Sequence, residues 1–117
     1  MRINVKAVSL QLDAATRTEI ERRMHASLGR IAHRILRVAV RVTDRNGPRG
    51  GEDIACAVEL RLRPRGRIYV EETDIDLAGA VSRATDTAVA TVVRVTEKTR
   101  DQQRRPTTDP AFDANGV

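Results

Sequence analysis

The side chains that most often perform catalysis or hold metal ions are few in this sequence of 117 residues, and their spacing assembles no site. Its two histidines, His25 and His33, do not stand one helical turn apart, as a helical zinc motif requires. The single cysteine, Cys56, belongs to an alternating apolar run, which is typical of a small buried side chain and not of a nucleophile. We therefore expect no enzyme, no metal site and no cofactor.

Carboxylates are paired at two places, Glu71 with Glu72 and Asp74 with Asp76, immediately before a segment of helical periodicity. Two neighbouring carboxylates can serve as general acid and general base. At the start of a helix, however, acidic residues are already explained by capping of backbone N–H groups and by the helix dipole. We interpret these pairs structurally, with Asp74 or Asp76 as the capping residue.

Basic residues are the more informative group. The chain has 21 Lys and Arg residues against 16 Asp and Glu residues, a net charge of +5, and 19 of the 21 are arginines. The guanidinium group is a rigid fork that suits phosphate oxygens. Only two aromatic residues, Tyr69 and Phe112, are present, so stacking of single-stranded bases is not expected. The composition is compatible with a nucleic-acid partner that is bound through phosphate and shape.

Hydrophobic periodicity predicts the elements that position these charges. Alternating apolar residues predict four strands, and apolar residues at steps of three and four predict two helices, the second with a stripe from Leu77 to Val95. Asp13 is the expected cap of the first helix. The predicted strands lie within 1–10, around 38–42, over 54–62 and around 68–70, and the predicted helices cover about 14–29 and about 77–102.

The order strand, helix, three strands, helix predicts the architecture. Each strand has one apolar face, so both helices are expected to cover that face. The first connection is then a right-handed parallel crossover, and the next two are antiparallel hairpins. We predict an α+β two-layer sandwich with a four-stranded mixed sheet and both helices on one face. The face left to solvent carries Lys6, Arg37, Arg41, Arg61, Arg63 and Arg67.

Domain boundaries follow from the same patterns. Residues 1–103 are expected to form one domain, and residues 104–117, which lack periodicity and contain two prolines, are expected to be a disordered tail. The Gly-rich stretch 44–52 predicts a mobile hairpin loop. No apolar run approaches the roughly 18 residues of a membrane span, and the N-terminus forms no signal-peptide apolar block. We expect a cytoplasmic protein without a membrane partner.

Both predicted helices carry basic residues beside their apolar stripes. At 100° per residue, Arg83, Arg94 and Lys98 fall on one side of the second helix, together with Thr87. Arg22, Arg23 and Arg30 lie off the stripe of the first helix in the same way. If the helices are neighbours, the two rows can join into a surface that follows an RNA backbone. A merely solvated pair of helix faces is the alternative, and the pattern does not decide between them.

Three motifs resemble the ribosome hibernation-promoting factor family, which is also called the ribosome-associated inhibitor or sigma-modulation family. They are Arg2-Ile3-Asn4-Val5 followed by Leu12-Asp13-Ala14-Ala15-Thr16-Arg17, the turn Leu62-Arg63-Pro64-Arg65-Gly66, and the helix opening Asp76-Leu77-Ala78-Gly79-Ala80-Val81. Their order and spacing, and not any one of them, carry the likeness, which covers about residues 1–103.

The resemblance implies a function. Family members bind the small ribosomal subunit in the channel for mRNA and tRNA and silence translation in stress or stationary phase, without a cofactor or a small-molecule substrate. It implies that ribosomal RNA is bound by basic residues on both helices, which here are Arg17, Arg23, Arg30, Arg94 and Lys98. Arg22 and Arg83 are basic additions of this sequence, whereas Thr87 and Ala90 replace residues that are usually basic in the family.

Two other classes of protein remain as alternatives. One is a protein-interaction module, which forms a weak homodimer through its basic sheet face or an exposed strand edge. The other is a general double-stranded RNA-binding domain without ribosome inhibition, because a sheet backed by two helices is a layout that such domains share.

Overall fold

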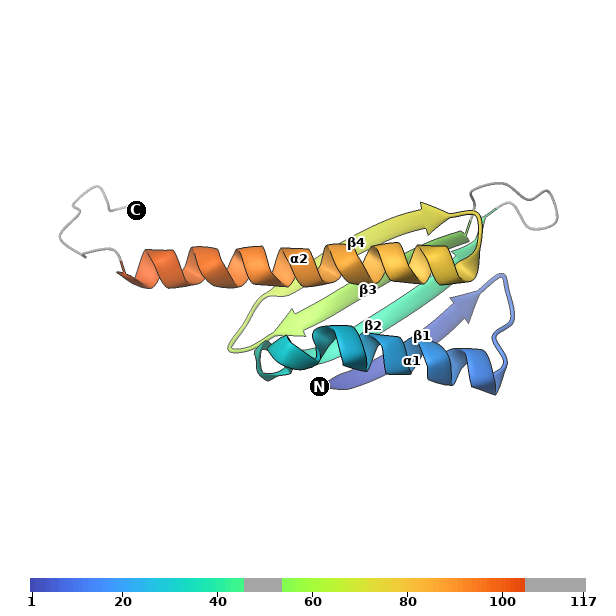
Figure 1. The fold of residues 1–117 in the computed structure, drawn as a ribbon, viewed down its shortest axis with the longest axis horizontal. Coiled ribbons are helices and arrows are strands. Elements are labelled where there is room, and N and C mark those ends of the chain that lie inside the picture. Colours follow the sequence, from blue (N-terminus) through green and yellow to red (C-terminus); the bar gives the residue numbers. More distant parts are fainter. Residues whose placement is uncertain (46–53, 105–117) are drawn as a thin grey trace.

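The structure, a computed structural model, describes residues 1–45 and 54–104, with side-chain surroundings up to Lys98. Figure 1 shows the elements. In chain order they are β1 (Arg2–Val8), α1 (Ala14–Leu28), the 3-10 helix η1 (Gly29–Arg34), β2 (Ile35–Asp44), β3 (Ile54–Leu62), β4 (Arg67–Asp74) and α2 (Leu77–Arg104).

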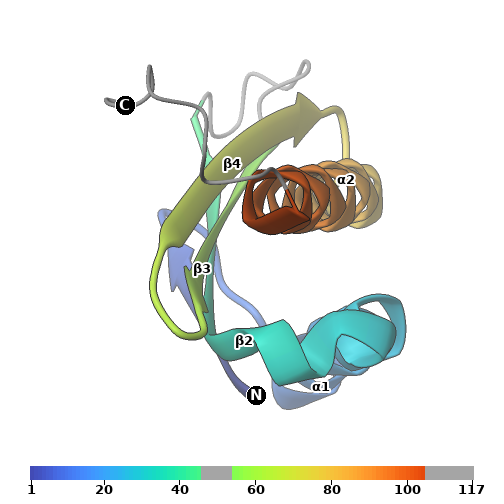
Figure 2. The same ribbon diagram turned by 90° about the vertical axis from the view of Figure 1, so that its left-hand side faces the viewer.

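The four strands form one mixed sheet in the order β1-β2-β3-β4. Strands β1 and β2 are parallel, as the crossover through α1 requires, and the two later pairs are antiparallel. Both helices cover the same face of the sheet, and the other face is open (Figure 2). The predicted fold class, an α+β two-layer sandwich, is therefore confirmed.

The core lies between the sheet and the two helices. Alternate residues of the strands point inward, and Val38, Val58 and Leu60 are fully buried there. Helix α1 contributes Ile20, Met24 and Leu28, which are spaced by four residues. The two helices meet at Thr85 of α2, whose hydroxyl donates to the carbonyl of Val81 at 2.6 Å and lies 3.6 Å from the Met24 sulfur. The inner face of the sheet thus has one continuous apolar cover.

Helix α2 starts at a capping carboxylate and ends beyond the sheet. Asp76 accepts a hydrogen bond from the backbone N–H of Gly79 at 2.7 Å, so it is the capping residue. It is one of the two residues that were predicted for this role. The helix buries residues as far as Val92, whereas Val93 and Val95 are 39% and 38% exposed. The prediction that Val95 belongs to the buried stripe is wrong, because the C-terminal part of α2 extends past the strands (Figure 1).

A 3-10 turn that the apolar pattern did not predict follows α1. The predicted end of the first helix, near residue 29, is close to the observed end at Leu28, but the chain then continues as η1. The backbone N–H of Arg63, in the turn between β3 and β4, donates to the carbonyl of Arg34 at 2.8 Å. In the same turn Gly66 has a φ of +121°, which side-chain-bearing residues rarely adopt. The hydrogen bond between Arg63 and Arg34 links η1 to this turn.

Two predicted segments lie largely outside the described residues. Of the predicted loop 44–52, residues 46–52 are outside them, and of the predicted tail 104–117, residues 105–117 are outside them. Among the described residues, no helix has the length and apolar character needed to cross a membrane.

Replacement of Leu28 by alanine is expected to lower the free energy of unfolding by about 3 kcal/mol, because this fully buried side chain leaves a cavity between α1 and the sheet. Urea unfolding followed by circular dichroism measures the change. Leu36→Ala is the matched control, because the Leu36 side chain is 51% exposed, and a change of less than about 0.5 kcal/mol is expected. Equal losses in the two variants would contradict the described core.

Candidate nucleic-acid interface

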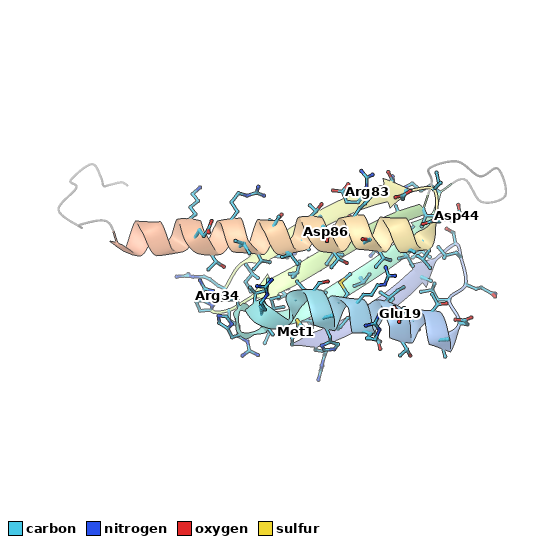
Figure 3. All side chains as sticks on the ribbon, viewed as in Figure 1. Met1, Glu19, Arg34, Asp44, Arg83 and Asp86 are labelled. Atoms are coloured by element: carbon cyan, nitrogen blue, oxygen red, sulfur yellow. The ribbon has the colours of Figure 1, made fainter. Side chains whose placement is uncertain are left out.

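Charge is distributed unequally along the molecule. The end that contains η1, the β3–β4 turn and the adjoining strand ends is called the basic end here, and the opposite end, where α1 and α2 begin, the acidic end. Arg34 and Asp44 mark the two ends in Figure 3. The basic end carries Arg2, Arg30, Arg34, Arg37, Arg61, Arg63, Arg65 and Arg67, and the acidic end carries Asp13, Asp44, Asp74 and Asp76.

Arg17, one of the predicted RNA-binding residues, has a structural contact. Its side chain is partly buried, and a guanidinium N–H donates to the carbonyl oxygen of Val5 in β1. The carbonyl belongs to the edge strand of the sheet, where half of the backbone polar groups have no neighbouring strand. Arg17 therefore ties α1 to β1, near the acidic end.

Arg22 and Arg23 share one carboxylate. Arg22 Nη2 lies 2.6 Å and Arg23 Nε lies 3.3 Å from the same oxygen of Glu19, one turn earlier in α1. Both arginines also line a groove of about 230 Å³ between the helices, whose wall on α2 is formed by Ser82, Thr85 and Asp86. The groove therefore holds charges of both signs, and the two cations are already half neutralised by Glu19.

The electrostatic effect of this cluster appears on the carboxylate. The hydrogen bond from Arg22 is the largest effect on the pKa of Glu19, which falls from 4.5 to about 2; desolvation is the next-largest effect and opposes it, and Arg23 lowers the pKa further. The same pair raises the pKa of Arg22. Glu19 is exposed, so salt is expected to weaken these effects.

Arg83 faces away from α1. Its Nη2 lies 3.8 Å from a carboxylate oxygen of Glu72 in β4, and the Thr87 hydroxyl donates to the other oxygen of Glu72 at 2.9 Å. Figure 3 shows Arg83 on the side of α2 that points away from α1, and residues of the opposite side line the groove. The basic rows of the two helices therefore do not join into a single surface, which was one of the two alternatives that the sequence pattern allowed.

Arg30, Arg94 and Lys98 differ from the other predicted residues. All three side chains are exposed. Within the part of the chain that the structure describes, none of them forms an ion pair; Arg94 only approaches the hydroxyl of Thr91, at 3.5 Å. Arg30 lies in η1, and the other two lie on the part of α2 that passes the basic end (Figure 1). Of the basic residues predicted to bind RNA, these three have the most capacity for an external anion.

The residues considered for catalysis do not come together. Cys56 is fully buried, and desolvation, with a smaller effect of Glu71, raises the pKa of its thiol to about 12. His25 and His33 are exposed. Across residues 1–45 and 54–98, no group of three or more His, Cys, Asp or Glu side chains is placed to hold a metal ion.

The fold, a sheet with two helices on one face, and the basic end together are typical of a binding protein of the α+β class. Residues 3–100 match the family model described as sigma 54 modulation protein / S30EA ribosomal protein. The chain therefore belongs to this family of ribosome-associated translation modulators, which are not enzymes. The family resemblance of the sequence motifs is thereby confirmed.

Solved structures give two further comparisons. The N-terminal domain of Protein Y from Thermus thermophilus is 26% identical, with a TM-score of 0.68 over 81% of this chain and 99% of that chain. A ribosomal subunit interface protein from Coxiella burnetii has a TM-score of 0.71 over 83% of this chain and 99% of that chain, but its identity of 11% shows a shared fold alone. A sequence comparison with curated proteins finds no significant match.

The pKa of Glu19 is expected to lie far below 4.5 in the native protein, because the charged form is stabilised by Arg22 and Arg23. The ion pairs then stabilise the folded state above about pH 4.5, and this contribution is lost as the pH falls toward 2. An NMR titration of the side-chain carboxyl carbon measures the pKa, and Arg22→Gln should raise it. Titration near 4.5 in the wild-type protein would rule out the shared pair.

Proposed function

We propose that this protein binds the small ribosomal subunit in the channel that mRNA and tRNA otherwise occupy, and that it inhibits translation there by occlusion during stress or stationary phase. Membership of a family of ribosome-associated modulators supports the partner. A protein of the same fold, from Coxiella burnetii, is a ribosomal subunit interface protein.

The observation that carries the proposal is that three of the predicted RNA-binding residues, Arg30 in η1 and Arg94 and Lys98 in the C-terminal half of α2, are exposed and form no ion pair among the described residues. Cations that are not neutralised within the fold can replace the counterions of a phosphate backbone, and the release of those counterions drives binding. Arg22, Arg23 and Arg83 already contact carboxylates. We expect them to contribute less per residue, since an RNA phosphate must compete with Glu19 or Glu72.

Occlusion requires shape and charge but no chemical step. The domain is a rigid wedge, because one continuous core fixes both helices on the sheet. With its basic end bound to ribosomal RNA, its volume excludes mRNA and tRNA from the same place. Thr87 is a weaker contact than the basic residue usual at this position in the family, because its hydroxyl already donates to Glu72. The protein is therefore expected to bind reversibly and with strong salt dependence.

Replacement of both Arg94 and Lys98 by glutamine is expected to weaken binding to purified small subunits by roughly 10- to 100-fold at about 100 mM salt. The slope of log affinity against log salt should fall by about 2, one unit for each lost phosphate contact. Co-sedimentation through a sucrose cushion over a salt series measures both. Inhibition of cell-free translation should decline in parallel.

The matched control is the double variant Arg41→Gln with Arg45→Gln, which removes the same charge. Arg45 pairs with Glu71, and Arg41 lies in the same cross-strand row as Glu71, so neither belongs to the basic end. This control should keep affinity and slope close to those of the wild type. Unchanged co-sedimentation of the Arg94 and Lys98 variant would exclude the contact model, and tighter binding to a plain RNA duplex than to subunits would favour a general RNA-binding domain.

A further inference from the structure

The strand register places four arginines side by side on the open face of the sheet. Arg2 in β1 is the register partner of Arg37 in β2, Arg37 is the partner of Arg61 in β3, and Arg61 is the partner of Arg67 in β4. All four side chains are exposed. They form a line across the full width of the sheet at the basic end, which is called the arginine row below.

Alternation along the strands explains why the row faces outward. Val38, Leu60 and Ile68, each next to a member of the row, are buried on the inner face, and successive side chains of a strand point to opposite faces. Arg37 pairs with Arg61 in the same register that joins Val38 to Leu60 and continues to Asp44 and Ile54, and a β-bulge between Ile35 and Arg37 interrupts this register just beyond the row. The regular register of the sheet therefore brings the four arginines into line.

The row is unfavourable for the fold by itself. Like charges directly opposite on neighbouring strands are destabilising, and strands about 4.8 Å apart bring four cations into a width of roughly 14 Å. Among the described residues, the one carboxylate in contact with the row is Glu59, 3.3 Å from the Nε of Arg67. The arrangement is therefore better explained by an anionic ligand than by stability of the domain.

We propose that the arginine row is a second phosphate-binding surface, which takes the sugar–phosphate backbone of ribosomal RNA. A nucleic-acid backbone is a linear array of charges, which matches a linear array of guanidinium forks, and each fork can bind two phosphate oxygens. A second copy of this chain fits poorly, because a symmetric contact would place arginine rows against each other. The inference rests on the proposed function for the identity of the RNA.

The arginine row and the cations of α2 lie in different layers of the domain, one on the open face of the sheet and the other on the helix that covers its opposite face (Figure 2). One straight RNA segment does not reach both layers. The protein therefore contacts RNA on two sides, as is expected of a domain that lies inside an RNA-lined channel and not on its rim.

The test compares four proteins: the wild type, Arg37→Gln with Arg61→Gln, Arg94→Gln with Lys98→Gln, and the control Arg41→Gln with Arg45→Gln. Binding to purified small subunits over a salt series should be about tenfold weaker for the Arg37 and Arg61 variant than for the control, with a slope lower by 1 to 2. Combining it with the Arg94 and Lys98 changes should multiply the two losses, because the sites are independent. Urea unfolding should show the Arg37 and Arg61 variant to be at least as stable as the wild type.

The outcomes separate the two proposals. Control-like binding of the Arg37 and Arg61 variant, together with a loss for the Arg94 and Lys98 variant, would overturn the arginine row and leave the proposed function intact. A loss of stability equal to the loss of binding would also overturn it. Row-dependent binding to vesicles of phosphatidylcholine and phosphatidylserine, without an effect on subunits, would reassign the surface to a membrane. Absence of wild-type binding to subunits would overturn the proposed function and this inference together.

Discussion

Burial of a single face of the sheet is the constraint on which the rest of the structure depends. The strands place most of their large aliphatic residues on the inner face, and α1 and α2 cover that face. A side chain on the outer face is therefore free to be charged at little cost to the core. Because the residues of each strand alternate between the faces, any cations on the outer face are brought into cross-strand lines by the register. The register that packs the inner face therefore also decides which charged side chains of the outer face lie side by side.

Periodicity is sufficient to predict the elements and their layers, since each amphipathic segment has one way to bury its apolar side. The observed β3 has the predicted bounds, 54–62. The apolar spacing of one element does not predict the lengths of the elements that it packs against. Val95 continues the apolar spacing of α2 and is nevertheless exposed, because the strands end before the helix does. Helix η1 has no apolar repeat, and a backbone hydrogen bond from Arg63 fixes its end from a distant turn.

The sequence predicts which basic residues lie on the exposed sides of the helices, but it predicts only part of their ion pairs. Helical angles identified the exposed sides of both helices, and Arg30, Arg94 and Lys98 are indeed exposed. The pairing of Glu19 with Arg22 and Arg23 could have been predicted as well, since the spacings of three and four residues are those of ion pairs along a helix. The contacts of Arg17 with Val5 and of Arg83 with Glu72 depend on how helices lie on the sheet, and the arginine row depends on the register of the four strands. Sequence periodicity contains none of these three.

The charge separation of the molecule follows from its topology together with ordinary helix capping. Helices α1 and α2 both begin at the same end of the sheet, because each follows a strand that runs toward that end. Their N-termini are capped by the carboxylates of Asp13 and Asp76, which also complement the positive end of each helix dipole. Cations are favoured at the opposite ends of the helices for the same reason, and Arg30 and Arg34 follow α1 there. The two helices run in the same direction. Carboxylates at their N-termini and cations at the opposite end therefore give the whole domain one charge dipole. Such a dipole orients the basic end toward a polyanion before contact is made, so the features that stabilise the helices also determine which end of the protein meets RNA.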